Sequence, residues 1–204
     1  GIFAVVGFAL YLFLFFTARE TVQRDVAHVS GKQSLAALKG NKPLIMLCLA
    51  SLAFLTAMFS LQTVNVYYAR DVLGNANYLT LLTILSTASI FLIAPLIPRI
   101  VRAFGKKTAF LGFGAIGIAG GLGISFSPPA TPWVSMVFFA VMGVSTAGVN
   151  TLMWALEADT VEYGEWRTGV RTEGITYALF SFTRKLGQAV GGAVAAYVIA
   201  FGGY

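Results

Sequence analysis

Long runs without any charged residue constrain this chain more than any other feature. Residues 1–18, 43–69, 72–98 and 108–156 contain no Asp, Glu, Lys or Arg. An apolar helix of about 20 residues crosses a hydrocarbon core of about 30 Å. Charged residues make up 11% of the chain, against about 25% in soluble globular domains. The sequence therefore predicts an all-α integral membrane protein that lies in a lipid bilayer, and it excludes a soluble domain.

The number of spans follows from how these runs are interrupted. As one helix, residues 108–156 would be about 74 Å long, and Pro128, Pro129 and Pro132 interrupt them. Because closely spaced prolines cannot continue a helix, this run is two spans joined by a tight turn. A last span begins near Gly174 and continues to about residue 200. We predict about six spans, and because the chain begins with Gly1 rather than Met, we expect a fragment whose first helix is entered partway.

The basic residues fix the direction of the spans. If residues 19–42 face the cytoplasm, alternation places residues 99–107 and the segment around Arg167 on the same side. In the opposite loops, residues 70–77 and 127–132, the only basic residue is Arg70. Such an excess of Lys and Arg is typical of cytoplasmic loops. The predicted cytoplasmic side carries these basic residues: Arg19, Arg24, Lys32, Lys39, Lys42, Arg99, Arg102, Lys106, Lys107, Arg167 and Arg171.

Several functional classes find no support in the sequence. The single Cys48 cannot form an intrachain disulfide. The basic residues are scattered between apolar spans, so the net charge of +6 indicates membrane topology rather than nucleic acid as a partner. No metal-ligand cluster, phosphate loop or nucleophile with its base is present. We therefore predict no catalytic residues, no metal and no cofactor.

Arg184 and Lys185 are the most informative polar residues. They lie about 11 residues beyond Gly174, roughly 16 Å into the bilayer, where each would cost at least about 2.5 kcal/mol facing lipid. Such residues mark a water-filled cavity or a substrate route, and the alternative is a structural ion pair. No Asp or Glu lies inside a predicted span, so either other helices or the substrate itself would supply the negative charge. Lys185 shares a helical stripe with Tyr177, Ser181 and Gln188.

Two further spans contribute polar residues that could face the same cavity. Gln62 and Asn65 are three residues apart, and Asn150 and Trp154 are four apart. Amides hydrogen-bond sugar hydroxyls, and aromatic rings stack on sugar faces. The alternative for the amides is hydrogen bonding between helices.

Pairs of glycines four residues apart recur in two spans. Gly117 and Gly121 form one pair, and Gly187 and Gly191 form the other. This spacing lets helices approach closely. We favour helix packing over substrate contact for both pairs.

The segment 157–173 holds five acids and two arginines between two spans. Charges of both signs suit a set of salt bridges that closes the inner mouth of a cavity and breaks when the mouth opens. Surface pairs are worth about 0 to 1 kcal/mol each, which suits a gate. A solvated loop is the alternative.

The same region carries a resemblance to a known family. Residues 153–192, MWALEADTVEYGEWRTGVRTEGITYALFSFTRKLGQAVGG, resemble the glycoside-pentoside-hexuronide cation symporters of the major facilitator superfamily, and most closely the bacterial glucuronide carriers. The ADxVxYGE core, the VRxEG motif and the lysine in midspan carry the likeness. NKPLIMLCLASLAF and FGKKTAF fit the family as well.

The resemblance implies a twelve-helix fold that works by alternating access of two six-helix bundles. Residues 1–18 would be the sixth helix, 19–42 the central cytoplasmic loop, and 43–204 helices seven to eleven of the C-terminal bundle. The N-terminal bundle, a partner of this chain, and the twelfth helix would be missing. The family's lysine, which serves cation and sugar binding, falls on Lys185. The inner-gate residues fall on Asp159, Glu162, Arg171 and Glu173, with Arg102 as a cross-loop partner.

The sequence thus predicts a secondary transporter of the bacterial inner membrane that moves a glycoside together with a cation. A glucuronide and a proton are the favoured pair, because Arg184 and Lys185 suit a carboxylate. A sodium- or proton-coupled symporter of neutral glycosides or pentosides is the alternative within the class. A membrane-embedded enzyme and a sugar sensor without transport are the alternatives from other classes.

Overall fold

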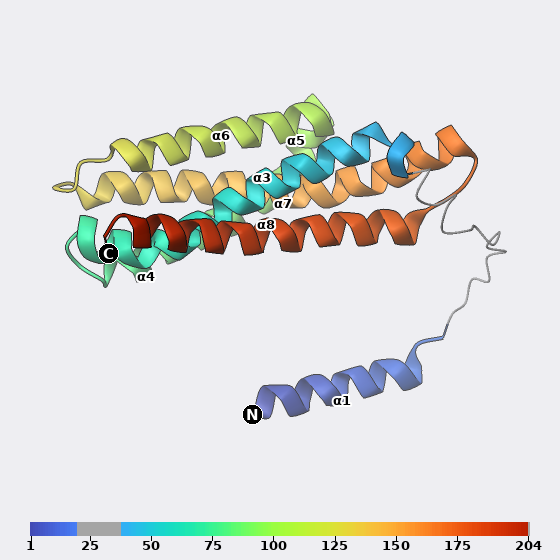
Figure 1. The fold of residues 1–204 in the computed structure, drawn as a ribbon, viewed down its shortest axis with the longest axis horizontal. Helices are drawn as coiled ribbons and strands as arrows, with labels where there is room; N and C mark the ends of the chain where they lie inside the picture. Colours follow the sequence, from blue (N-terminus) through green and yellow to red (C-terminus); the bar gives the residue numbers. More distant parts are fainter. Residues whose placement is uncertain (20–37, 204) are drawn as a thin grey trace. The chain divides into compact units, whose positions relative to one another are not determined.

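The computed structural model describes residues 1–19 and 38–203 (Figure 1). The chain divides into two units, residues 1–31 and residues 32–204. In the first unit, α1 (Ile2–Thr17) is an apolar helix. Most of the predicted central loop, residues 19–42 with His28, lies outside the described residues.

The second unit is a bundle of long helices. Across the described residues there is no strand, which confirms the all-α prediction. By length and composition, four helical stretches could cross a membrane: Lys42–Val72, Tyr78–Phe104, Lys106–Phe126 and Pro132–Thr168. The last helix, α8, has 29 residues, but Arg184, Lys185 and Gln188 at its centre lower its hydropathy. The elements of the second unit, in chain order, are α3 (Lys42–Tyr67), the π-helix η1 (Tyr68–Val72), α4 (Tyr78–Ile93), the 3-10 helix η2 (Ala94–Leu96), α5 (Ile97–Phe104), α6 (Lys106–Phe126), α7 (Pro132–Thr168) and α8 (Glu173–Phe201).

Glycine and proline move several element ends from their predicted places. The third span begins at Tyr78 rather than at residue 72, after a loop in which Gly74 has φ +75°. Pro95 lies in the 3-10 turn that separates α4 from α5. The predicted loop at residues 99–107 is instead helical on both sides of Gly105, whose φ of +79° makes the turn. A residue with a Cβ would be strained there.

The acidic segment after residue 156 is helical and not a loop. α7 continues to Thr168 and ends at Gly169, which adopts the left-handed conformation with φ +69°. A left-handed glycine after the last turn is a common helix stop. The charged segment predicted to lie between two spans is therefore helical as far as Thr168, and the alternative of a solvated loop is wrong for this part of it. α7 contains 37 residues, about 55 Å, and is longer than the hydrocarbon core.

The helices pack in pairs. α3 lies mainly against α8, while α6 and α4 lie against α7 (Figure 1). Between α3 and α8, Thr56 donates a hydrogen bond to the carbonyl of Gly187 (3.3 Å) and Ser60 to that of Gly191 (2.8 Å). A Cβ on either glycine would collide with the backbone of α3, which confirms the packing role predicted for this pair.

The other predicted glycine pair is only half confirmed. Gly117 faces the Ser145 side chain of α7, but Gly121 has no neighbour within 4 Å of its Cβ position. Gly120 and Gly123 make the remaining close approaches of α6, to Met142 and Phe138. The contact face of α6 therefore follows a different spacing from the one expected.

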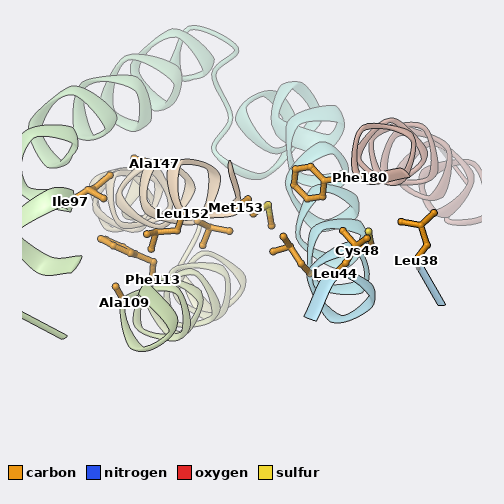
Figure 2. Close-up of a cluster of buried hydrophobic side chains, with 12 residues drawn as sticks. Leu38, Leu44, Cys48, Ile97, Ala109, Phe113, Ala147, Leu152, Met153 and Phe180 are labelled. Atoms are coloured by element: carbon orange, nitrogen blue, oxygen red, sulfur yellow. The ribbon is translucent and has the colours of Figure 1, made fainter. Parts of the chain in front are cut away.

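A buried apolar cluster joins α3, α5, α6, α7 and α8 near the predicted cytoplasmic end (Figure 2). Phe113 of α6, Leu152 and Met153 of α7, and Phe180 of α8 are part of it. At its edge Asn41 caps α3 by accepting a hydrogen bond from the Leu44 N–H, and its amide donates to the Thr160 carbonyl of α7 (2.7 Å). The cluster and this cap hold α7 and α8 in the positions that form the candidate site.

Candidate functional site

Arg184 lies near the middle of α8 and reaches α7. Its Nη2 donates a hydrogen bond to Asn150 Oδ1 (3.2 Å), and its Nη1 lies 3.4 Å from the sulfur of Met153. The Asn150 amide also donates to the Thr146 carbonyl one turn earlier (3.1 Å), which orients its oxygen toward the arginine. Arg184 is half-buried and forms no ion pair with any carboxylate in the described part of the chain. The structure therefore presents a guanidinium held by neutral groups.

Aromatic rings surround the same guanidinium. Its carbon lies 5.0 Å from the ring centre of Trp154 and 5.7 Å from that of Phe180. Trp154 also contacts Phe180 (5.3 Å, edge to face) and Tyr177 (5.8 Å). Contacts between a cation and a ring are worth about 0.5 to 2 kcal/mol each. We call Asn150, Trp154, Tyr177, Phe180 and Arg184 the arginine cluster.

Only some of the residues predicted for the substrate site lie together in the structure. Arg184, Asn150, Trp154 and Tyr177 meet in the arginine cluster. The other members of the α8 stripe are half-buried (Ser181 and Gln188) or exposed (Lys185), and their side chains form no hydrogen bond or ion pair with another described residue.

Gln62 and Asn65 lie elsewhere, in a cavity of about 400 Å³ between α3, α4 and α7. The hydroxyl side chains of Thr83, Thr87 and Thr146 line the same cavity. Asn65 Oδ1 is buried without a hydrogen-bond partner among the described residues. Because Thr146 lies one turn from Asn150, α7 connects this cavity to the arginine cluster.

Ion pairs gather where α6 begins and where α7 and α8 meet. Lys106 binds both carboxylate oxygens of Asp159 (2.6 and 2.8 Å). Arg171 binds Glu165 (2.7 Å) and Glu173 (3.0 Å), and these hydrogen bonds, with that to Glu165 first, raise the pKa of Arg171. The predicted partner Arg102 is exposed, as is Glu162, and neither ion-pairs with another described residue. Lys106, which sequence reasoning did not select, makes the cross-helix contact instead.

The pair of Lys106 and Asp159 is expected to contribute little to stability. Both side chains are about two-fifths exposed (41% and 43%), and exposed pairs contribute about 0 to 1 kcal/mol. A double-mutant cycle of Lys106→Gln and Asp159→Asn, measured as unfolding of the full-length protein in mixed micelles, should give a coupling energy below about 1 kcal/mol. A coupling above about 2 kcal/mol would show a fixed structural pair and argue against a contact that opens readily.

Glu157 was also missed by the sequence analysis, which placed every acid in a loop or at a span end. It lies inside α7, and only 8% of it is exposed. None of the described residues hydrogen-bonds or ion-pairs with its carboxylate. The signal that could have found it is the regular helical sequence that continues from residue 156 to Gly169.

Comparison with known proteins places the chain in a family. The family model described as MFS/sugar transport protein matches residues 1–204. A glucuronide carrier protein homolog of Escherichia coli is 41% identical over 204 residues, which is all of this chain and 45% of the relative. A candidate 2,3-dihydroxypropane-1-sulfonate exporter of Salmonella typhimurium is 41% identical over 173 residues, 84% of this chain and 37% of the relative.

A more distant relative, the isoprimeverose transporter of Lactiplantibacillus pentosus, is 30% identical over 207 residues, covering 100% of this chain and 43% of the relative. The chain therefore spans less than half the length of these curated relatives. No solved structure matches.

Proposed function

Because the chain belongs to the MFS/sugar transport protein family, we propose that the whole protein is a secondary active transporter that carries a glycoside by alternating access. Its membership confirms the resemblance to the glycoside-pentoside-hexuronide symporters, and it is a multi-pass protein of the bacterial inner membrane. The proposal assigns it no catalytic residue and no cofactor other than a co-transported cation.

One observation carries the choice of substrate. Arg184 is a half-buried cation that the described residues surround with an amide, a thioether and two aromatic rings, but with no carboxylate. A guanidinium binds a carboxylate through two parallel hydrogen bonds, a geometry that a neutral sugar hydroxyl cannot match. The favoured substrate is therefore a glucuronide, whose carboxylate would pair with Arg184 while Trp154 stacks on the sugar ring.

The remaining polar residues extend this site. Lys185, Ser181 and Gln188 continue along α8 on either side of Arg184, and Lys185 supplies a second positive charge. Gln62 and Asn65 are proposed to bind sugar hydroxyls from their own cavity, since the unpartnered Asn65 Oδ1 is ready to accept a hydrogen bond.

The ion pairs at the predicted cytoplasmic end are proposed to form the inner gate. Asp159 with Lys106, and Arg171 with Glu165 and Glu173, join α6, α7 and the start of α8. Each pair is exposed and individually weak, so a conformational change could break them one at a time. Glu162 and Arg102 are exposed at the same end and are proposed to pair across the gate with residues outside this chain.

The names of the relatives support an acidic substrate without deciding it. Two relatives are named for substrates that carry an acid group, a glucuronide and a propane sulfonate. A third relative is named for isoprimeverose, a neutral sugar. A symporter of neutral glycosides or pentosides is therefore the second candidate. Proton coupling is proposed over sodium coupling.

The experiment compares an acidic with a neutral sugar in the full-length protein. Inverted or right-side-out vesicles with an imposed pH gradient would be given a labelled β-glucuronide or the matching β-glucoside. We expect at least about tenfold faster uptake of the glucuronide, the effect of one charge-assisted hydrogen bond of about 1.5 kcal/mol or more. Equal uptake of both sugars would leave the transporter class intact and reject the glucuronide, and uptake of neither would reject the transport of glycosides.

A further inference from the structure

We propose that the carboxylate of Glu157 is a proton-binding site at the predicted cytoplasmic mouth of the transporter. The inference rests on the proposed function and deepens it, because it gives the coupling ion a residue in this half of the protein. The site borders the arginine cluster at Tyr177 and uses an acid to which neither the substrate site nor the gate assigns a role.

The site is a cavity of about 300 Å³ where α7 and α8 meet. Glu157 and Glu162 line it from α7, Glu173 and Tyr177 from α8, and Arg171 from the connection between them. These are the charged and titratable groups that face Glu157 across the cavity. Three carboxylates and one guanidinium make the cavity acidic.

Glu157 differs from the other acids because it is buried and unpartnered. It is 8% exposed, whereas Glu162 and Glu173 are exposed. Arg171 is engaged by Glu165 and Glu173, and Lys106 by Asp159, so no described cation neutralises Glu157. Keeping a carboxylate charged in a largely buried cavity without a cation beside it is costly. A proton removes that cost, because a carboxyl group carries no charge.

A proton fits this cavity better than a metal ion does. Ions such as Ca²⁺ and Mg²⁺ are bound by six or more oxygen ligands, several of them from carboxylates or water. In the described part of the chain no three acidic, histidine or cysteine side chains converge closely enough to hold a metal. A proton needs only one carboxylate oxygen, to which it binds on entry and from which it leaves to the cytoplasm.

The structure also connects this cavity to the arginine cluster. Tyr177 lines the cavity and contacts Trp154 (5.8 Å), and Trp154 packs on Arg184 (5.0 Å). A proton at Glu157 and an anion at Arg184 would therefore bind to the same two helices, separated by two aromatic rings. Occupancy of both sites would neutralise one negative and one positive charge on these two helices, which gives the two ligands a common effect on α7 and α8.

The test replaces Glu157 by glutamine in the full-length protein, reconstituted in lipid vesicles. Glutamine has the shape of the protonated carboxyl group but cannot release a proton. We expect Glu157→Gln to lose accumulation driven by a pH gradient by at least about tenfold, while exchange of internal for external sugar, which needs no proton release, stays within about twofold of wild type. Glu157→Asp, which keeps a titratable group, should restore part of the accumulation.

Asp71→Asn is the matched control. It removes one carboxylate from an exposed ion pair with Arg70 (2.8 Å) in η1, which follows the end of α3 that lies away from Glu157. Wild-type accumulation is expected. Accumulation within about twofold of wild type in Glu157→Gln would overturn the proposal. Loss of exchange together with accumulation would assign Glu157 a structural role and would overturn it equally.

A second measurement does not depend on transport. The infrared difference spectrum between wild type and Glu157→Gln should contain a protonated-carboxyl band that disappears as the pH is raised. Absence of this band at every pH would reject proton binding at Glu157 even if glycoside transport is established. Conversely, a titrating band in a protein that carries no glycoside would reject the proposed function alone.

Discussion

Replacing Arg184 by alanine should lower β-glucuronide uptake by the full-length protein by about 10- to 100-fold. The variant removes the only charged group of the arginine cluster, and hydrogen bonds to charged groups contribute about 1.5 to 3 kcal/mol. The uptake rate of Arg184→Lys should lie between those of wild type and Arg184→Ala, because lysine keeps the charge but cannot form the paired hydrogen bonds of a guanidinium. Initial rates in vesicles, measured over a range of sugar concentrations, would separate weaker binding from slower transport.

The matched control for this variant is Arg99→Ala. Arg99 is an exposed residue of α5, so its loss changes the net charge equally without touching the cluster, and near wild-type uptake is expected. Glucuronide uptake within about twofold of wild type in Arg184→Ala would show that Arg184 only supports the packing of α7 and α8. The acidic substrate would then lose its main structural support.

The composition of the chain predicted where its helices lie, but not where they end. Charge-free runs locate the helices because hydrocarbon excludes charge whatever the details of packing. Their ends depend on single backbone positions instead. Gly105 and Gly169 adopt positive φ and stop helices, whereas the charged residues after residue 156 do not. Charge was read as the end of α7, and the helix continues for three further turns.

The candidate site was predictable in its residue types and not in its contacts. Arg184 is recognisable because a charge in the middle of a span is costly. Its contact with Asn150 depends on how α7 and α8 are rotated about their axes. Helices that are apolar on nearly every side contain little periodicity from which that rotation could be read. The same lack of periodicity explains why the sequence predicted Gly121 as a contact of α6, although Gly120 and Gly123 face α7 instead.

Gly191 should be a position at which even the smallest substitution, glycine to alanine, lowers stability. A Cβ there would lie 2.5 Å from the Thr56 carbonyl oxygen and 3.0 Å from Phe59 Cβ. Backbone atoms of α3 cannot move aside as a flexible side chain could, so α3 and α8 must separate. Overpacking of this kind costs about 1 to 3 kcal/mol, and separation would also lengthen the hydrogen bond from Ser60 to the Gly191 carbonyl (2.8 Å).

Gly192→Ala is the control because it makes the same change one residue away. The nearest atom to its Cβ position is Thr63 Oγ1 at 4.0 Å, and alanine favours a helix over glycine by about 1 kcal/mol. In thermal unfolding of the full-length protein in detergent, Gly191→Ala should unfold several degrees below wild type and Gly192→Ala at or above it. Equal midpoints for the two variants would mean that α3 and α8 do not approach closely at Gly191. The arginine cluster would then lose its rigid support, because α3 would no longer fix the position of α8 beside α7.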